Sequence, residues 1–316
     1  MDSTIEARGL NKFYGNFHAI EDVTFSVKKG EILGFLGPNA AGKTTTMRIV
    51  TGFMPPSSGS VTIAGHDVIT ESIEARKQVG YLPETVPLYT DMTVQGYLNF
   101  MGTIRGMHPN RIKTRISNVI DICRLGDYRK THIGKLSKGF RQRVGIAQAI
   151  IHEPPVLVLD EPTIGIDPIQ VVETRRLIKE LGEDHTIILS THVLPEVSMV
   201  CQRVLIIHQG QIMAEDSPQN LAERLQGVDR IEVEVQGPAP QVMEALRRVK
   251  GMIDVTRSTD GDRSTYSVQV RHGLDLRDEI SKAIVTNGWS LLGLQLMSMS
   301  LEDIFLQLTT KEAVSE

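Results

Sequence analysis

The chain has 316 residues with a formal net charge of −4, and 41% of its residues are hydrophobic against 23% charged. This length predicts two domains, and this composition is typical of a soluble globular protein, so it excludes a chain that is disordered throughout and does not favour a nucleic-acid partner. The two cysteines lack metal-ligand spacing, so neither a zinc site nor a disulfide framework is expected.

The first part of the chain predicts two paired strands and then a strand, a loop and a helix. Residues 5–10 and 23–27 alternate apolar and polar side chains, which is typical of half-buried antiparallel strands. Residues 31–36 form a mostly apolar run that stops at Gly37, so a buried strand is expected there. Residues 43–53 are expected to form a helix that a glycine loop opens.

The middle of the chain predicts a helical region followed by buried strands. Residues from about 71 to 150 look mainly helical, and residues 93–107 and 109–125 carry apolar side chains at helical spacing. A further helix over 141–152 ends before two prolines, which cannot continue the hydrogen-bond ladder. Short apolar runs follow at residues 156–159, 187–189 and 204–207. Such strands, separated by helices, indicate a parallel sheet covered on both faces.

Beyond about residue 225 the pattern changes to that of a small α+β domain. The expected elements are a strand at 231–235, a helix at 240–249, a strand pair at 253–258 and 264–270, a helix at 274–287, a strand at 291–297 and an amphipathic helix at 301–308. Their β-α-β-β-α-β order is a recurrent α+β motif. No catalytic or ligand-binding motif stands out in this part.

A phosphate-binding loop is the strongest chemical signal in the sequence. Residues 37–44 match G-x-x-x-x-G-K-[ST] between a predicted strand and a predicted helix. In this motif, backbone N–H groups and the positive helix N-terminus surround phosphate oxygens. We expect Lys43 to bridge the β- and γ-phosphates and the Thr44 hydroxyl to bind Mg²⁺. The expected nucleotide contacts here are Gly37, Pro38, Asn39, Ala40, Ala41, Gly42, Lys43, Thr44 and Thr45.

Two carboxylates follow the predicted buried strand at 156–159. Asp160 and Glu161 lie at the carboxyl end of that strand, which is the edge where open α/β sheets bind ligands. We expect Asp160 to hold Mg²⁺ through water and Glu161 to polarise the attacking water as general base. Taken without the phosphate-binding loop, the same pattern also fits a solvated strand end.

Ser137 and Gly139 stand just ahead of the predicted helix at 141–152. A hydroxyl, free N–H groups and the helix dipole together favour an anion at such a helix start. Beside a phosphate-binding loop, this second site implies a second nucleotide or the other face of a shared one. The pattern alone leaves open that Ser137 is an ordinary N-cap.

In order and spacing, these motifs resemble the Walker A, signature and Walker B motifs of the ATP-binding subunit of an ABC transporter. The resemblance covers about residues 3 to 220. It implies an α/β P-loop NTPase cassette over 1–224, with an antiparallel β subdomain and a helical subdomain at about 84–150. The C-terminal α+β accessory domain is then residues 225–316.

The resemblance also assigns residues that the motifs above do not. Tyr14 resembles the aromatic residue that stacks on adenine, and residues 165–167 resemble the D-loop. His192 resembles the histidine that contacts the γ-phosphate, which makes it catalytic together with Glu161 and Lys43. One position departs from the family pattern: Glu84 stands where the family usually has Gln. As a carboxylate, Glu84 can ligate Mg²⁺ directly, beside Thr44 and Asp160.

The subgroup that the sequence resembles is that of the ATPases of ABC-2-type exporters. The features that carry this likeness are Pro83-Glu84, the C-terminal extension, and the sequence Ser-Leu-Glu-Asp-Ile-Phe at 300–305. It implies a cytoplasmic ATPase with ATP and Mg²⁺ as cofactors. The resemblance also implies that two copies associate head to tail, with ATP between the Walker A motif of one and the signature of the other. We expect this homodimer to drive separate transmembrane permease subunits docked near residues 84–100, and to be peripheral on the inner face of the cell membrane. We expect no export signal, and no run of 18 apolar residues could span a bilayer.

Two other kinds of protein remain as alternatives. Soluble ABC-type ATPases act without a membrane partner in translation or DNA repair, but they usually carry tandem cassettes or a long coiled coil. This chain has one set of motifs and no sustained heptads. A nucleotide-binding regulator is the third reading, and Glu161 and His192 argue against it because they predict turnover.

Residues 101–140 are more basic than the rest of the chain. Nine Lys or Arg residues stand there against Asp121 and Asp127: Arg105, Arg111, Lys113, Arg115, Arg124, Arg129, Lys130, Lys135 and Lys138. This asymmetry indicates an anionic partner such as lipid headgroups, and the alternative is a solvated basic face.

Overall fold

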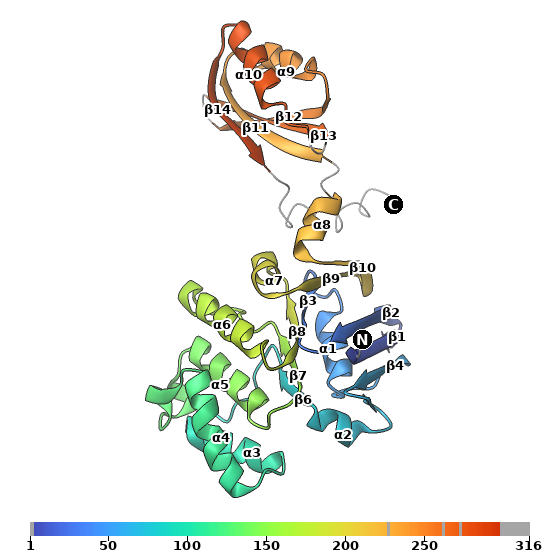
Figure 1. The fold of residues 1–316 in the computed structure, drawn as a ribbon, viewed down its shortest axis with the longest axis vertical. Helices are drawn as coiled ribbons and strands as arrows, with labels where there is room; N and C mark the ends of the chain where they lie inside the picture. The colour runs from blue at the N-terminus through green and yellow to red at the C-terminus, as the bar shows by residue number, and fades with distance from the viewer. Residues whose placement is uncertain (1–2, 226–227, 261–262, 272–273, 298–316) are drawn as a thin grey trace. The chain divides into compact units, whose positions relative to one another are not determined.

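The computed structural model describes residues 3–225, 228–260, 263–271 and 274–297 (Figure 1). Contacts between residues divide the chain into two units, Met1–Pro218 and Gln219–Glu316. The division falls at the start of helix α8 (Pro218–Leu225), six residues before the boundary expected from the sequence. The expected boundary is later because the change in composition marks strand β11 (Val228–Gln236) and not the helix before it. Among the described residues, no helix has both the length and the apolar character needed to cross a membrane.

The first unit contains two sheets and a set of helices. Its strands are β1 (Ser3–Tyr14), β2 (Phe17–Lys28), β3 (Ile32–Leu36), β4 (Ser58–Ile63), β5 (His66–Asp67), β6 (Val79–Leu82), β7 (Val156–Asp160), β8 (Thr186–Thr191), β9 (Arg203–His208) and β10 (Gln211–Asp216). Its helices are α1 (Lys43–Val50), α2 (Ser72–Lys77), α3 (Val94–Ile104), α4 (Pro109–Ile122), α5 (Lys138–Ile150), α6 (Pro168–Leu181) and α7 (Leu194–Val200), with 3₁₀ turns at Gly126–Tyr128 and Ile133–Lys135.

The central sheet has six strands in the order β10-β9-β3-β8-β7-β6. Neighbouring strands from β9 to β6 run parallel, and only β10 pairs antiparallel, with β9. Every residue of β3, β7 and β8 is buried. The parallel pairings of β7, β8 and β9 confirm the parallel sheet predicted from the apolar runs at 156–159, 187–189 and 204–207. Because these three strands are parallel neighbours, the loops that follow them leave the same edge of the sheet.

One face of the central sheet packs on the antiparallel sheet β2-β1-β4-β5, with α1 between them. Phe25 of β2 meets Phe35 of β3 edge to face, with ring centroids 5.1 Å apart. The other face carries helices, and α7 lies against β3 and β8 (Figure 1). Gly34 of β3 makes this close packing possible, because a Cβ there would lie 2.7 Å from Val197 Cγ1 of α7.

Helices α3, α4 and α5 form the helical region. Thr93 caps α3 by accepting a hydrogen bond from the N–H of Gly96 at 3.1 Å, and Ile112 of α4 packs against Gly102 of α3. The sequence, however, predicted a mainly helical stretch from residue 71, whereas β6 is a strand at the edge of the central sheet. A four-residue strand is too short for period-two alternation to show, and its glycine further weakens the strand pattern.

The second unit has the β-α-β-β-α-β order expected from the sequence. Its elements are β11 (Val228–Gln236), α9 (Ala239–Arg247), β12 (Met252–Asp260), β13 (Arg263–Arg271), α10 (Arg277–Thr286) and β14 (Ser290–Met297). The strands form an antiparallel sheet in the order β12-β13-β11-β14. A separate apolar core forms where Val242 and Leu246 of α9, and Ile280 and Ile284 of α10, pack around Tyr266. The helix expected at 301–308 lies outside the described residues.

Candidate active site

A cavity of about 390 Å³ lies beside the loop between β3 and α1. The sequence-predicted residues that line it are Tyr14, Asn39, Ala40, Ala41, Gly42, Lys43, Thr44, Thr45, Glu84 and Glu161. Phe17, Ala19 and Ile164 complete the lining and were not predicted. The structure therefore brings together residues from β1, the phosphate-binding loop, the segment after β6 and the segment after β7.

The loop itself has a backbone that few residues can adopt. Gly42 has φ of 102°, and a Cβ there would lie 2.7 Å from Ile20 Cγ2 and 2.9 Å from the carbonyl oxygen of Ala19. Ala40 also takes a positive φ, 64°, which costs a residue with a Cβ roughly 1–2 kcal/mol. Helix α1 begins directly after this loop, so its free N–H groups face the cavity side of the loop.

Lys43, the first residue of α1, is the cation of this site, and its side chain is only 5% exposed. Its Nζ donates to the carbonyl oxygens of Gly37 at 2.8 Å and Pro38 at 3.1 Å. The third contact of Nζ is Glu161 Oε1, at 3.3 Å. Gly37 and Pro38, which the sequence placed among the nucleotide contacts, thus hold Lys43 and do not line the cavity.

Asp160 ends β7 and is fully buried. Its Oδ1 accepts a hydrogen bond from the Ser190 hydroxyl, while Oδ2 is buried and has no hydrogen-bond partner among the described residues. Burial raises the pKa of the Asp160 carboxyl, and hydrogen bonds from the hydroxyls of Ser190 and Thr44 oppose that shift. An unpartnered carboxylate oxygen beside a threonine hydroxyl fits Mg²⁺, which takes oxygen ligands and uses few protein groups when phosphates supply the others.

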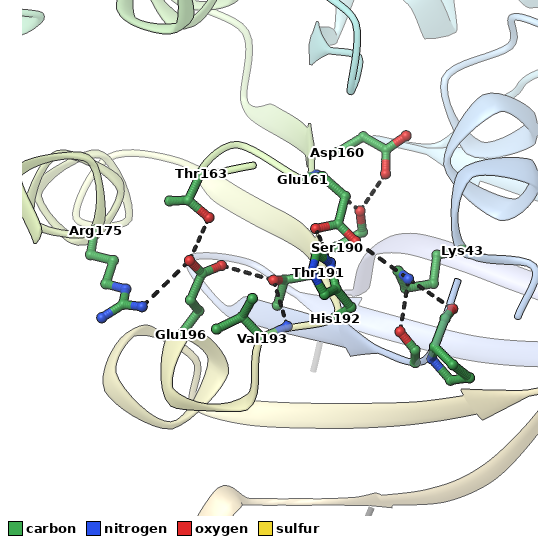
Figure 2. A network of polar contacts seen from close by, with 12 residues as sticks. Lys43, Asp160, Glu161, Thr163, Arg175, Ser190, Thr191, His192, Val193 and Glu196 are labelled. Carbon is green, nitrogen blue, oxygen red and sulfur yellow. Dashed lines mark hydrogen bonds and ion pairs between the residues drawn. The ribbon is translucent and has the colours of Figure 1, made fainter. Parts of the chain in front are cut away.

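Glu161 connects the phosphate-binding loop to the end of β8 (Figure 2). Its side chain is 6% exposed, and its Oε2 lies 2.8 Å from Nδ1 of His192. The backbone N–H of Glu161 donates to the carbonyl oxygen and the hydroxyl of Ser190, at 3.1 and 3.2 Å. These bonds hold Glu161 at φ of 49°, a left-handed conformation that is uncommon for glutamate. A carboxylate held between a lysine and a histidine can accept a proton from a water beside it.

Ser137 and Gly139 lie away from this cavity. Ser137 caps α5 by accepting a hydrogen bond from the N–H of Phe140 at 3.4 Å, and its own side chain is exposed. Neither residue lines the cavity around Lys43. Their neighbour Lys138 lines a second cavity, of about 390 Å³, together with Glu84. Within one chain, the predicted site is therefore divided between two places.

Several polar side chains of this region were not predicted from the sequence. Ser190 and Thr191 end β8, and Glu196 lies in α7, where it contacts Thr191 and Thr163 (Figure 2). Ser190 and Thr191 could have been found from the sequence, because they are hydroxyl residues at the carboxyl end of an apolar run, where the ligand-binding edge of the sheet forms. Glu196 gave no such signal, since an isolated glutamate in a short helix looks like a surface residue.

The comparisons with known proteins agree with this geometry. Residues 20–164 match the family model described as ABC transporter. The linearmycin resistance ATP-binding protein LnrL of Bacillus subtilis (strain 168) is 33% identical, over 96% of this chain and 98% of that protein. The bacitracin transport ATP-binding protein BcrA of Bacillus licheniformis is 34% identical, over 98% of each. Nod factor export ATP-binding protein I of Rhizobium sp. (strain N33) is 33% identical, over 98% of this chain and 97% of that protein.

The chain belongs to the ABC transporter family. This ABC protein also resembles a solved structure described as the ATP-binding subunit of an ABC transporter, with 30% identity and a TM-score of 0.64 over 71% of this chain and 93% of that one. The ABC cassette fold expected from the sequence is thereby confirmed, and the enzyme class is that of an ATPase.

Proposed function

We propose that this ABC protein is the ATP-hydrolysing subunit of an ABC-2-type membrane exporter. The relatives named for bacitracin transport, linearmycin resistance and Nod factor export each match at least 96% of it, so the likeness extends beyond the cassette. The contact of the buried Glu161 carboxylate with both Lys43 and His192 carries the catalytic part of the proposal. The chain works from the cytoplasm, on the inner face of the membrane, through transmembrane permease subunits that dock near residues 84–100.

Fractionation of the native cells tests this assignment against a soluble ABC-type ATPase. The full-length chain should sediment with membranes, and alkaline carbonate should release it because it is held there by permease subunits. A tagged form should bring an integral membrane protein with it through purification in mild detergent. Sedimentation with ribosomes or with DNA would instead support the alternative function.

In this proposal, Lys43 takes part both in ATP binding and in freeing Glu161 for proton transfer. The N–H groups of the loop and the start of α1 bind the phosphates, and Lys43 bridges the β- and γ-phosphates. Lys43 already donates to two carbonyl oxygens, so a phosphate takes the place of Glu161 on its Nζ. That exchange leaves the Glu161 carboxylate free to accept the proton of the attacking water, while His192 contacts the γ-phosphate.

The metal in this proposal is Mg²⁺, held by Thr44, Asp160 and Glu84. The unpartnered Oδ2 of Asp160, beside the Thr44 hydroxyl, supports a metal held by these two residues. The place of Glu84 in the cavity lining supports Glu84 as the third ligand. The Glu84 charge also contributes to the raised pKa of Asp160, after burial and the neighbouring Glu161. When bound, Mg²⁺ neutralises charge on the phosphates. A carboxylate in place of the family's usual Gln offers the metal a negatively charged oxygen instead of a neutral amide oxygen.

Tyr14 is the proposed adenine contact. It ends β1, lines the cavity and is 45% exposed, so one part of the ring is open to stacking. Its hydroxyl lies 3.3 Å from the sulfur of Met54, and Lys12 Nζ lies 5.7 Å from the ring centre. These two contacts help to hold the ring beside the cavity.

The dimer in this proposal follows from the division of the site. Ser137 and Gly139 are away from the cavity of their own chain, so they contact the ATP held by Lys43 of a second copy. Two copies placed head to tail then form two composite sites, with ATP bound between them. ATP favours the closed dimer because its γ-phosphate gains donors from both chains, and hydrolysis removes that bridge.

Mixing two inactive variants should restore ATP hydrolysis if the sites are composite. Ser137→Arg places a bulky cation where the phosphate binds, and Lys43→Ala removes the phosphate-binding cation. Each pure variant should be inactive, whereas the mixed dimer contains one pairing of an intact loop with an intact signature. Phosphate release measured across mixing ratios should peak near equal amounts. A rate that stays at the average of the two separate rates would indicate self-contained sites.

Removing the second unit should leave ATP binding intact. A chain truncated after Gln219 retains the whole cavity lining and the core of the first unit. We expect its dissociation constant for ATP to stay within about twofold of the full chain, while dimerisation or coupling to the permease can still weaken. The measurement is a calorimetric titration of a truncated chain whose folding is checked by circular dichroism. Loss of ATP binding in that folded chain would mean that the second unit contributes to the site.

Anionic lipid is the remaining partner in this proposal. Its support is the basic stretch 101–140, but several of these charges are paired within the chain. Arg111 and Arg115 contact Glu153, and Arg124 contacts Glu180. The basic charge left for lipid is therefore smaller than the sequence alone suggests.

A further inference from the structure

Glu196 is a buried carboxylate with no part in the proposed chemistry. It lies in α7 and is 2% exposed. Its Oε1 accepts a hydrogen bond from the hydroxyl of Thr163 and lies 3.5 Å from Nη2 of Arg175. Its Oε2 accepts a hydrogen bond from the hydroxyl of Thr191 at 2.8 Å. A carboxylate so far from water is retained only when charge and hydrogen bonds compensate for burial, and this one has both.

The partners of Glu196 belong to the two segments that hold the catalytic pair (Figure 2). Thr163 follows Glu161 by two residues, on the turn after β7. Thr191 precedes His192 directly, and its hydroxyl also accepts from the N–H of Val193 at 3.0 Å. One side chain thus connects the segment that carries Glu161 to the segment that carries His192.

The bonds require a carboxylate at this position. Both threonine hydroxyls donate to it, and a carboxylate accepts on both oxygens, whereas a glutamine amide accepts on only one. The negative charge also pairs with Arg175 of α6, the helix whose N-terminus Asp167 caps by accepting from the N–H of Gln170 at 3.0 Å. Glu196 therefore also contacts the helix that follows residues 165–167.

We propose that Glu196 is a positioning residue for ATP hydrolysis, which holds Glu161 and His192 at hydrogen-bonding distance by binding Thr163 and Thr191. The inference rests on the proposed roles of Glu161 and His192. Their own contact is 2.8 Å. Ser190 also joins the two segments, where they leave the sheet, because its hydroxyl accepts from the N–H of Glu161 and donates to Asp160. Glu196 adds a link beyond Ser190, at Thr163 and Thr191, and release of either threonine removes that link.

The first test is a comparison of rate with affinity in the full-length chain. Glu196→Gln should lower kcat roughly 10- to 100-fold, because a misplacement of about 1 Å in an active site can cost 10²-fold. The dissociation constant for ATP should change by less than about twofold, since Glu196 contacts none of the residues around the phosphates. Thr191→Val should lower kcat as well, and Thr191→Ser should restore it because serine keeps the hydroxyl.

A matched control separates positioning from general stability. Glu31 is another mostly buried glutamate of the first unit, paired with Arg203 away from the cavity. Glu31→Gln should lower the melting temperature as Glu196→Gln does, yet leave kcat unchanged. If both variants lower kcat in proportion to their melting temperatures, or if Glu196→Gln keeps the wild-type kcat, the proposal is wrong.

A double-mutant cycle with His192 identifies the route of the effect. In a chain that already carries His192→Ala, Glu196→Gln should lower kcat by less than about twofold, because coupled residues are non-additive. The same loss in both backgrounds would show that Glu196 acts independently of the histidine. Glu161→Gln belongs in the same series: its full activity would refute the proposed function itself, whereas an inactive Glu161→Gln beside a fully active Glu196→Gln refutes only the inference.

Discussion

Glu161→Gln should bind ATP and hydrolyse it about 10²- to 10⁴-fold more slowly, which is the range that general base catalysis contributes. The amide has the shape of the carboxylate but cannot accept a proton from water. It also removes the negative charge 3.3 Å from Lys43 Nζ, so a phosphate meets less competition for that cation. The variant should therefore accumulate as an ATP-bound dimer, seen by gel filtration, while single-turnover phosphate release is nearly lost.

A surface glutamate gives the control for this experiment. Glu183→Gln changes an exposed carboxylate of the same unit, away from the Lys43 cavity, and should leave the rate unchanged. Turnover by Glu161→Gln at the wild-type rate would exclude Glu161 as the base.

Lys43→Ala should weaken ATP binding itself, by roughly 10- to 100-fold. Hydrogen bonds to charged groups contribute about 1.5–3 kcal/mol, and each 1.4 kcal/mol changes affinity tenfold. The substitution also leaves the carbonyl oxygens of Gly37 and Pro38, and the Glu161 carboxylate, without their buried cation. We therefore expect a lower melting temperature in addition to the loss of affinity.

Two further variants make the Lys43 result specific. Lys77→Ala removes an exposed lysine whose partner is Glu74, and should change neither affinity nor melting temperature. Lys43→Arg keeps the charge but not the compact ammonium, so it should fall between wild type and alanine. A calorimetric ATP titration of folded Lys43→Ala that matches the wild type would rule out the phosphate contact.

The parts of the site that the sequence predicts are those in which one short segment carries the whole signal. The loop around Lys43 is of this kind, because its glycines, lysine and threonine lie within eight residues of one another. Asp160 and Glu161 are of this kind too, since a buried strand directly precedes them. In both cases covalent spacing fixes the geometry, so the residue pattern is enough.

Contacts that depend on packing were not predictable in the same way. Thr163 and Glu196 are 33 residues apart, and they meet because α7 packs on α6 and on β8, the neighbour of β7 in the sheet. The same applies to Ser190 and Asp160, which are brought together by the register of β7 and β8. The separation of Ser137 from the cavity is a third example, because it depends on where α5 begins relative to the central sheet.

The parallel order of β3, β8 and β7 determines when this site can form during folding. Ile32 of β3 pairs with Ile187 of β8, so the strand before the phosphate-binding loop finds its neighbour only after more than half the chain is available. Two strands so far apart in sequence lose much chain entropy before their pairing contributes favourable contacts, so such pairings form slowly. During synthesis, the loop leaves the ribosome long before His192 does. The nascent chain must therefore protect the apolar β3 without help from bound ATP until β8 arrives.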